Sequence, residues 1–238
     1  MKENTQNQNH RVGFHSIEAI IKTNPHKIKK LILPKNREDK RIEDLVNLIE
    51  INNLKYEFSK KVKQEPEAFI QEDKRDFKDL KNHIENLISP VILILDNIID
   101  PRNLGACLRS AAVTNVDAVI INKHHCAPLN AISHKVSAGG VEALDIFYVT
   151  NLVNCLAYLT KINIKIFGLS EHAQKSYSDY SYDDGVSFIM GSEEEGIRKK
   201  TLEKCDELIN LSFNKDFKSF NVSVATGIIL AEVTKQRK

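Results

Sequence analysis

The chain has 238 residues, of which 42% are apolar and 28% charged, and its formal net charge is +2. This composition is typical of a globular protein and excludes a largely disordered chain, and no apolar run approaches the ~20 residues that a bilayer span needs. The opening segment MKENTQNQNHRVG is polar and lacks the apolar core of a signal peptide. We therefore expect a cytoplasmic protein with a disordered tail over residues 1–10 and no association with a membrane.

Helical and strand patterns alternate over residues 11–60, which predicts a small α/β domain of two helices and at least two strands. Eight Lys or Arg residues fall between positions 22 and 41, against only Glu38 and Asp39. A basic patch of this kind attracts polyanions, and nucleic acid is the most common one. The alternative is a solvated helix face. The residues that we expect to contact RNA here are Lys27, Lys29, Lys30, Arg37, Lys40 and Arg41.

Residues 61–89 are highly charged and lose strand character, which predicts a linker, partly helical, between two domains. From residue 90 strands and helices alternate again. The expected strands are 91–95, 117–121, 145–149, 163–169, 187–191 and 207–211, and the expected helices are 103–114, 151–161, 197–205 and 221–236. This order predicts a mostly parallel sheet covered by helices on both faces, with ligands beyond the carboxyl ends of the strands.

The stretch DPRNLGACLRSA (100–111) follows the apolar strand VILIL and lacks the glycines that cradle a diphosphate. Its apolar positions form one helix face, made by Leu104, Cys107, Leu108, Ala111 and Ala112. Arg109 lies off that face, where it is either a functional side chain or an ordinary exposed arginine. Asn103 has the chemistry of a helix cap.

The stretch IMGSEEEGIRKKT (189–201) has two glycines, Gly191 and Gly196, at the spacing of a phosphate loop. Ile197 and Arg198 stand where that motif needs Lys and then Ser or Thr. Three consecutive carboxylates, Glu193 to Glu195, would repel a phosphate. The loop therefore suits a neutral or cationic ligand, the alternative being an acidic turn that faces solvent ahead of a helix.

The stretch KSFNVSVATGIILAEV (218–233) predicts a helix that Ser219 or Asn221 caps. Its small residues would let another part of the backbone pack closely against the helix. The alternative is an ordinary helix of the hydrophobic core. The four cysteines, Cys107, Cys126, Cys155 and Cys205, are widely spaced, so we expect reduced thiols without a disulfide framework. HHC at 124–126 has no second ligand cluster, and we expect no metal site.

Taken in order, NLGACLRSA, IMGSEEEGIRKKTLEKCDELINL and SFNVSVATG resemble the SpoU (TrmH-like) RNA 2'-O-ribose methyltransferases of the SPOUT superfamily. The resemblance covers residues 90–237. GFHSIEAI and NREDKRI are similar to the L30e-like substrate domain of bacterial 23S rRNA guanosine 2'-O-methyltransferases. The resemblance implies an α/β fold with a deep trefoil knot in residues 90–238, S-adenosyl-L-methionine as cofactor, a homodimer, and 23S rRNA or a ribosome assembly intermediate as partner.

The resemblance also implies roles for single residues. The implied catalytic residues are Asn103, Arg109, Glu193, Ser219 and Asn221, the cofactor residues are Gly191, Leu211 and Phe220, and Arg102 joins the RNA-binding set. Because a guanidinium pKa above 12 makes a costly base, we expect Arg109 to clamp a phosphate and stabilise developing charge. The chain departs from the family pattern at Glu194 and Phe220, where a small residue and a leucine are usual, and it lacks a His-Gln-Gly segment before residue 90.

Two other functions are compatible with these residues. One is a tRNA ribose 2'-O-methyltransferase, which the L30e-like domain disfavours. The other is a catalytically silent RNA-binding protein of the same fold, which the intact set of implied catalytic residues disfavours.

Overall fold

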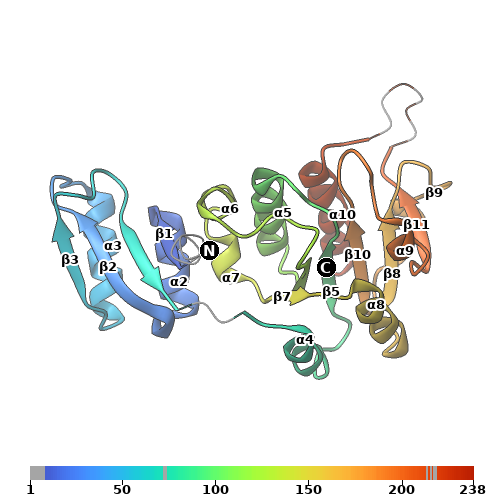
Figure 1. Cartoon of the computed structure of the whole chain (residues 1–238), viewed down its shortest axis with the longest axis horizontal. Coiled ribbons are helices and arrows are strands. Elements are labelled where there is room, and N and C mark those ends of the chain that lie inside the picture. Colours follow the sequence, from blue (N-terminus) through green and yellow to red (C-terminus); the bar gives the residue numbers. More distant parts are fainter. Residues whose placement is uncertain (1–8, 72–73, 213, 215, 217–218) are drawn as a thin grey trace.

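The computed structural model describes residues 9–71, 74–212, 214, 216 and 219–238. It shows two α/β parts side by side, a small amino-terminal part and a larger carboxy-terminal part (Figure 1). The expected tail over residues 1–10 lies almost entirely outside the described residues. Within the described residues no helix is long and apolar enough to cross a membrane.

The amino-terminal part is a four-stranded sheet with two helices on one face. The strands are β1 (His10–Val12), β2 (Ile28–Pro34), β3 (Tyr56–Ser59) and β4 (Glu67–Ile70), in the order β1-β4-β2-β3, and the helices are α2 (Phe14–Thr23) and α3 (Lys40–Ile51), with a 3-10 turn η1 (Pro25–Lys27). Asp39 caps α3, because its side chain accepts hydrogen bonds from the backbone amides of Arg41 and Ile42. Ile42, Leu45 and Ile49 fall at helical spacing and are buried against the sheet.

The segment 61–89, expected to be a linker, contains two elements that belong to the folded parts. β4 pairs antiparallel with both β1 and β2, so the amino-terminal sheet extends to residue 70. The helix α4 (Phe77–Ile84) buries Leu80 and Ile84 in the core of the carboxy-terminal part. A four-residue strand among charged residues has too weak a local pattern to predict, and only its pairing across the sheet defines it.

The carboxy-terminal part is a seven-stranded sheet in which every adjacent pair is parallel, which confirms the fold class. The strands are β5 (Val91–Leu95), β6 (Ala118–Asn122), β7 (Ile146–Val149), β8 (Lys165–Leu169), β9 (Lys175–Ser176), β10 (Val186–Met190) and β11 (Glu207–Asn210), in the order β7-β6-β5-β10-β8-β11-β9. β5, β6 and β10 are buried along their whole length. Burial on both faces explains why these strands are apolar without alternation.

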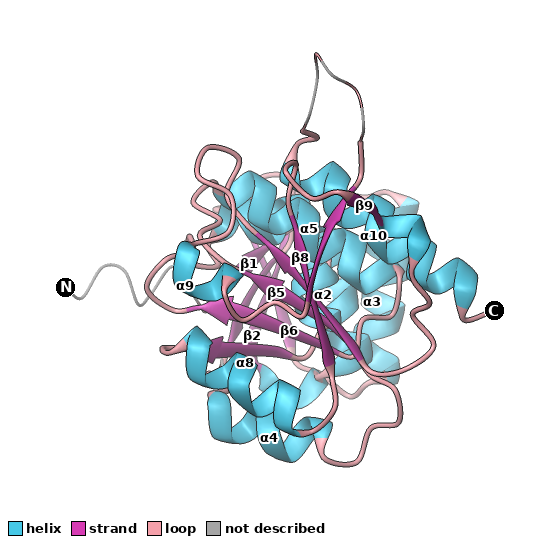
Figure 2. Ribbon diagram, turned by 90° about the vertical axis from the view of Figure 1, so that its right-hand side faces the viewer, coloured by secondary structure: helices cyan, strands magenta, loops and turns pink. Residues whose placement is uncertain are grey.

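Helices cover both faces of this sheet (Figure 2). They are α5 (Pro101–Val113), α6 (Ala131–Ser137), α7 (Gly140–Ala143), α8 (Leu152–Lys161), α9 (Lys199–Leu202) and α10 (Val222–Gln236), with a 3-10 turn η2 (Tyr177–Asp179). α5 and α10 share one hydrophobic core with alternate strand residues such as Leu93 and Leu95. α4 and α8 pack on the other alternate residues of β5, Ile92 and Ile94, on the opposite face of the sheet.

Two helix boundaries differ from the expectation. α5 begins at Pro101, and its cap is Asp100, whose carboxylate accepts a hydrogen bond from the Arg102 amide at 2.8 Å. Asn103 therefore lies inside the helix with its side chain available for another contact. The helix expected over 197–205 is only the four residues of α9, because the preceding loop extends to Arg198.

Candidate active site

The candidate site lies where the parallel strands β8, β10 and β11 end. These strands are adjacent in the sheet, so the loops that leave their carboxyl ends meet at one edge. Together with the start of α10 they enclose a cavity of about 370 Å³. It is lined by Leu169 to His172, by Met190 to Ile197, by Leu202 and Ile209 to Leu211, and by Ser219, Phe220, Val222 and Ala225.

All three predicted cofactor residues, Gly191, Leu211 and Phe220, line this cavity. Ser219 also lines it and is exposed. The segment Leu169 to His172 was not singled out from the sequence. It follows a strand directly, and the rule that ligands bind beyond the carboxyl ends of parallel strands would have found it.

The loop after β10 is a tight hairpin that Gly191 makes possible. Ser192 and Gly196 exchange two backbone hydrogen bonds of 3.1 and 3.0 Å. A Cβ atom on Gly191 would lie only 2.1 Å from the carbonyl carbon of Gly196, so no larger residue fits there. Gly196 has φ +67°, a left-handed conformation that favours glycine. The two glycines therefore close a hairpin that projects Glu193, and they do not form a phosphate cradle.

Three of the predicted catalytic residues meet beside the cavity. The Asn221 side-chain amide Nδ2 donates a hydrogen bond to Asn103 Oδ1 at 3.1 Å and another to Glu193 Oε1. Asn103 comes from the first turn of α5, Glu193 from the hairpin after β10, and Asn221 from the cap of α10. The fold thus joins three stretches that are far apart in the sequence.

Packing of α10 on α5 places Asn221 next to Asn103. Thr226 Oγ1 of α10 lies 3.3 Å from Cys107 Sγ of α5 inside their interface. Burial raises the pKa of the Cys107 thiol to about 12, so this cysteine is a packing residue and not a nucleophile. Asn221 Oδ1 accepts a hydrogen bond from the Ser223 amide at 3.0 Å, which caps α10 as expected.

Two side-chain pairs join the hairpin to the loop that follows β5. Arg198 Nη2 lies 2.7 Å from Oδ1 of Asp96, a fully buried carboxylate at the end of β5. Asn97 Nδ2 donates a hydrogen bond to Glu195 Oε2 at 3.1 Å. These pairs fix the position of Glu193 relative to α5. Sequence reasoning did not identify them, because no local pattern relates residues about 100 positions apart.

Arg109 does not join the cluster around Asn221. Its side chain is exposed on α5, and it forms no hydrogen bond or ion pair with any described residue. Arg109 follows Asn103 by six residues, about 1.7 turns of helix, and the 100° step per residue puts the two on different sides of α5.

The predicted RNA-binding residues form no single cluster. Arg37 and Arg41 both lie over the Phe14 ring, each 4.6 Å from its centre, while Lys40 is exposed nearby at the start of α3. Lys30 forms an ion pair of 2.7 Å with Glu57. Lys29 is exposed on β2, Lys27 lines a cavity between the two parts, and Arg102 of the carboxy-terminal part is paired with its own helix cap, Asp100.

The four cysteines are free, with Cys107 and Cys155 buried and Cys126 and Cys205 half-buried. Among the residues that the structure describes, no group of three His, Cys, Asp or Glu side chains could hold a metal ion.

Comparison with known proteins gives two family matches and close relatives. Residues 90–231 match the SpoU rRNA Methylase family, and residues 12–63 match the RNA 2'-O ribose methyltransferase substrate binding family. The chain is 37% identical over 236 residues to the 23S rRNA (guanosine-2'-O-)-methyltransferase RlmB of Escherichia coli K12, covering 94% of this chain and 97% of the relative. The RlmB of Photorhabdus laumondii is 34% identical over 241 residues, with the same coverage of both chains.

Solved structures share the fold along nearly the whole chain. The SpoU methyltransferase AviRb from Streptomyces viridochromogenes, solved in complex with AdoMet, aligns with a TM-score of 0.81 at 18% identity and covers 99% of this chain and 92% of its own. An AdoMet-bound rRNA methyltransferase from Sinorhizobium meliloti aligns with a TM-score of 0.78 at 18% identity, covering 99% and 90%. With the fold and the family match in agreement, the chain belongs to the SpoU rRNA methylase family.

Proposed function

We propose that this protein transfers a methyl group from S-adenosyl-L-methionine to the 2'-hydroxyl of a guanosine in 23S rRNA. The observation that carries the proposal is the meeting of Asn103, Glu193 and Asn221 beside a cavity that Gly191, Leu211 and Phe220 line. The activity of the RlmB relatives, which match 94% of the chain, supports the choice of substrate.

The cavity suits the cofactor in size and chemistry. A volume of about 370 Å³ lies within the range of small-molecule sites, about 300–1,000 Å³. Leu211 and Phe220 would contact the adenine, and Gly191 would keep the hairpin closed beside it. When bound, S-adenosyl-L-methionine supplies an electrophilic methyl group on a positively charged sulfonium. The carboxylates of Glu193 to Glu195 favour such a cation.

The side chains of the cluster would position the ribose. A 2'-hydroxyl is a poor nucleophile at neutral pH, so its orientation and the removal of its proton decide the rate. The Glu193 carboxylate and the Asn103 carbonyl are hydrogen-bond acceptors for that hydroxyl, and Asn221 holds both in place. Ser219 would contact the substrate from the cavity rim, and Arg109 would bind the adjacent phosphate and stabilise developing negative charge.

A homodimer would bring Arg109 to the site. The arginine lies apart from the cluster of its own chain, so we propose that it reaches the cluster of a second copy. α10 is apolar around most of its circumference, and Val224 on its outer side is 49% exposed. A helix of this kind is normally buried on all sides. The second copy would cover this side of α10.

The proposal is tested by methyl transfer to 23S rRNA taken from cells that lack the protein, with mapping of the 2'-O-methylated nucleotide. We expect one guanosine of 23S rRNA to be modified, on free rRNA or on an assembling ribosomal particle. If the methyl group were transferred to tRNA and not to 23S rRNA, the protein would be the alternative tRNA ribose 2'-O-methyltransferase. If calorimetry detected no binding of S-adenosyl-L-methionine while RNA still bound, the protein would be the catalytically silent RNA-binding alternative.

The cytoplasmic location, the trefoil knot, the L30e-like character of the amino-terminal part and the RNA contacts of its basic residues stay predictions. Sedimentation at working concentrations tests the homodimer, because an active monomer would exclude a shared site.

A further inference from the structure

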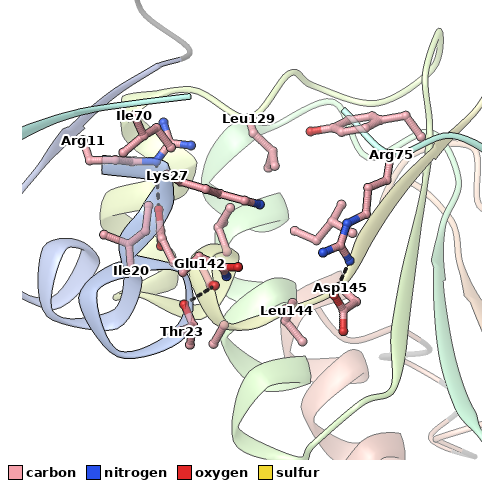
Figure 3. A pocket seen from close by; sticks show the side chains of 15 residues that line it. Arg11, Ile20, Thr23, Lys27, Ile70, Arg75, Leu129, Glu142, Leu144 and Asp145 are labelled. Atoms are coloured by element: carbon pink, nitrogen blue, oxygen red, sulfur yellow. Dashed lines mark hydrogen bonds and ion pairs between the residues drawn. The ribbon is translucent and has the colours of Figure 1, made fainter. Parts of the chain in front are cut away.

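A second cavity lies between the two parts of the molecule, away from the cofactor cavity. Its volume is about 330 Å³. The amino-terminal part contributes Ile20, Thr23, Asn24, Lys27 and other residues, the connecting segment contributes Arg75, and the carboxy-terminal part contributes the stretch from Val141 to Ile146. Figure 3 shows Lys27 extending across this cavity towards Arg75 on its opposite wall.

Buried charges hold the two walls together. Arg11 of β1 donates a hydrogen bond from Nε to Glu142 Oε1 of α7 at 2.9 Å (Figure 3), and His134 Nδ1 donates to the same oxygen at 2.7 Å. Arg11, Glu142 and His134 are each only 2–8% exposed. Thr23 Oγ1 also donates to the Glu142 carbonyl oxygen at 3.0 Å. These hydrogen bonds join the two parts of the molecule at one buried junction, so the cavity beside it is already formed in the protein without a ligand.

The charges that line the cavity leave an excess of positive charge. Both lining carboxylates are already paired, Glu142 with Arg11 and Asp145 with Arg75. Lys27 forms no ion pair with any residue that the structure describes. Its backbone is held on both sides, since its amide donates to Asn24 and its carbonyl accepts from Gln71. A half-buried ammonium directed into a cavity favours an anion there.

Apolar side chains also line the cavity, with Ile20 and Ile70 on one side and Leu129, Leu144 and Ile146 on the other, beside the polar Thr23 and Asn24. A cavity that combines a cationic end with polar groups and several apolar side chains matches a nucleotide, which has a phosphate, a hydroxyl-bearing ribose and a flat base. We infer that this cavity binds one nucleotide of the substrate RNA, with its phosphate between Lys27 and Arg75 and its base against the apolar side chains of the lining. The inference rests on the proposed function, because it takes RNA as the substrate.

This nucleotide is not the one that is methylated. The cavity lies at the amino end of β7, where Asp145 and Ile146 line it, whereas the cofactor cavity lies at the carboxyl ends of β8, β10 and β11. Its occupant therefore contributes to recognition and not to chemistry. Contacts that act equally in the ground state and the transition state lower KM and leave kcat unchanged.

The test compares Lys27→Gln with a matched control, Lys55→Gln. Lys55 is exposed before β3, on the edge of the amino-terminal sheet farthest from β1, and does not line the cavity. RNA affinity is measured between about 50 and 200 mM salt, where each phosphate contact steepens the log–log slope by roughly 1. For Lys27→Gln we expect a slope smaller by about 1 and a raised KM, with kcat at saturating RNA unchanged. For Lys55→Gln we expect wild-type values.

A second variant tests occupation of the cavity without changing charge. Ala143 is exposed and lines the cavity, so Ala143→Trp should fill it from one wall and weaken RNA binding to a similar extent. If Lys27→Gln matched Lys55→Gln, or if Ala143→Trp bound RNA like wild type, the inference would be wrong.

Two further measurements separate the sources of failure. The first is competition of GMP with bound RNA. If submillimolar GMP displaced RNA from the wild-type protein but not from the Lys27→Gln variant, the cavity would be a site for free nucleotides and the assignment to RNA would be wrong. Methyl transfer by the wild-type protein is measured in the same preparations. Failure of the proposed function would appear as absent transfer in wild type, whereas failure of this inference alone leaves wild-type transfer intact.

Discussion

At the scale of single residues, Asn221 has two separable roles. Its Oδ1 caps α10, and its Nδ2 bridges Asn103 and Glu193. Asn221→Asp keeps a good cap but replaces the donor by a carboxylate that faces Glu193. We expect the thermal midpoint to stay near wild type while kcat falls roughly 10- to 100-fold, because a hydrogen bond to a charged group contributes about 1.5–3 kcal/mol. Calorimetry of the cofactor is the control, and unchanged kcat would contradict the bridging role.

Arg109 is a second test at this scale. Because the side chain is exposed and bonds to no described residue, Arg109→Ala should preserve the fold and cofactor binding. We expect turnover to fall at least ~100-fold, the usual effect of removing one preorganised charge-stabilising group. Arg109→Lys should not restore it, since an ammonium lacks the planar fork of a guanidinium. Single-turnover methyl transfer measures the effect, and near-normal turnover in the alanine variant would exclude a catalytic role.

At the scale of structural elements, the hairpin after β10 determines whether the cofactor cavity exists. In Gly191→Ala the new methyl group would overlap the Gly196 backbone, so the hairpin must open. In Gly196→Ala nothing lies within 4 Å of the new Cβ, and only the left-handed backbone is strained, at a cost of about 1 kcal/mol. We expect calorimetry to detect no cofactor binding in the first variant and nearly normal binding in the second. If the two variants bound the cofactor with equal affinity, the closed hairpin would not be required for cofactor binding.

The same element shows the limit of spacing as a signal. Two glycines five residues apart are compatible with a phosphate loop and with a closed hairpin. The carboxylates between them already favoured a site for a neutral or cationic ligand. The close contact between the Gly191 and Gly196 backbones identifies the loop as a hairpin. This contact depends on backbone geometry, which the spacing of the two glycines alone does not specify.

At the scale of the whole molecule, the buried junction makes stability depend on pH. Burial raises the pKa of Glu142, but the hydrogen bond from His134 and the charges of His134 and Arg11 outweigh this and hold it below its ordinary value. A lowered pKa in the folded state stabilises the protein above the unfolded pKa of about 4.3, and the contribution is lost as the pH falls through the folded value.

Glu142→Gln removes this contribution. At pH 7 we expect the free energy of unfolding to fall by about 3–5 kcal/mol, the usual effect of removing one partner of a buried ion pair. The difference from wild type should narrow below about pH 4.3. Denaturant unfolding at several pH values measures it, with the exposed Glu203→Gln as control. A difference that is constant across this range would show that the carboxylate charge does not stabilise the junction.

The sequence by itself determined the local features and the family. Hydrophobic period and turn residues are properties of neighbouring positions, so they predicted the parallel α/β fold and strands such as β5 and β10. They also predicted a cap of α10 at Ser219 or Asn221, and the structure shows that Asn221 is the cap. The resemblance of three stretches then identified Gly191, Leu211 and Phe220, which the structure places around one cavity.

Only the tertiary structure decided which distant residues meet. The pairs Asn221–Asn103 and Arg11–Glu142 are 118 and 131 positions apart, and Arg198 reaches Asp96 across 102. No local preference specifies such contacts, because they depend on how strands are ordered in the sheet and how helices pack on it. The strand β4 has the same origin: its four residues become a strand because β1 and β2 offer unpaired backbone groups on either side.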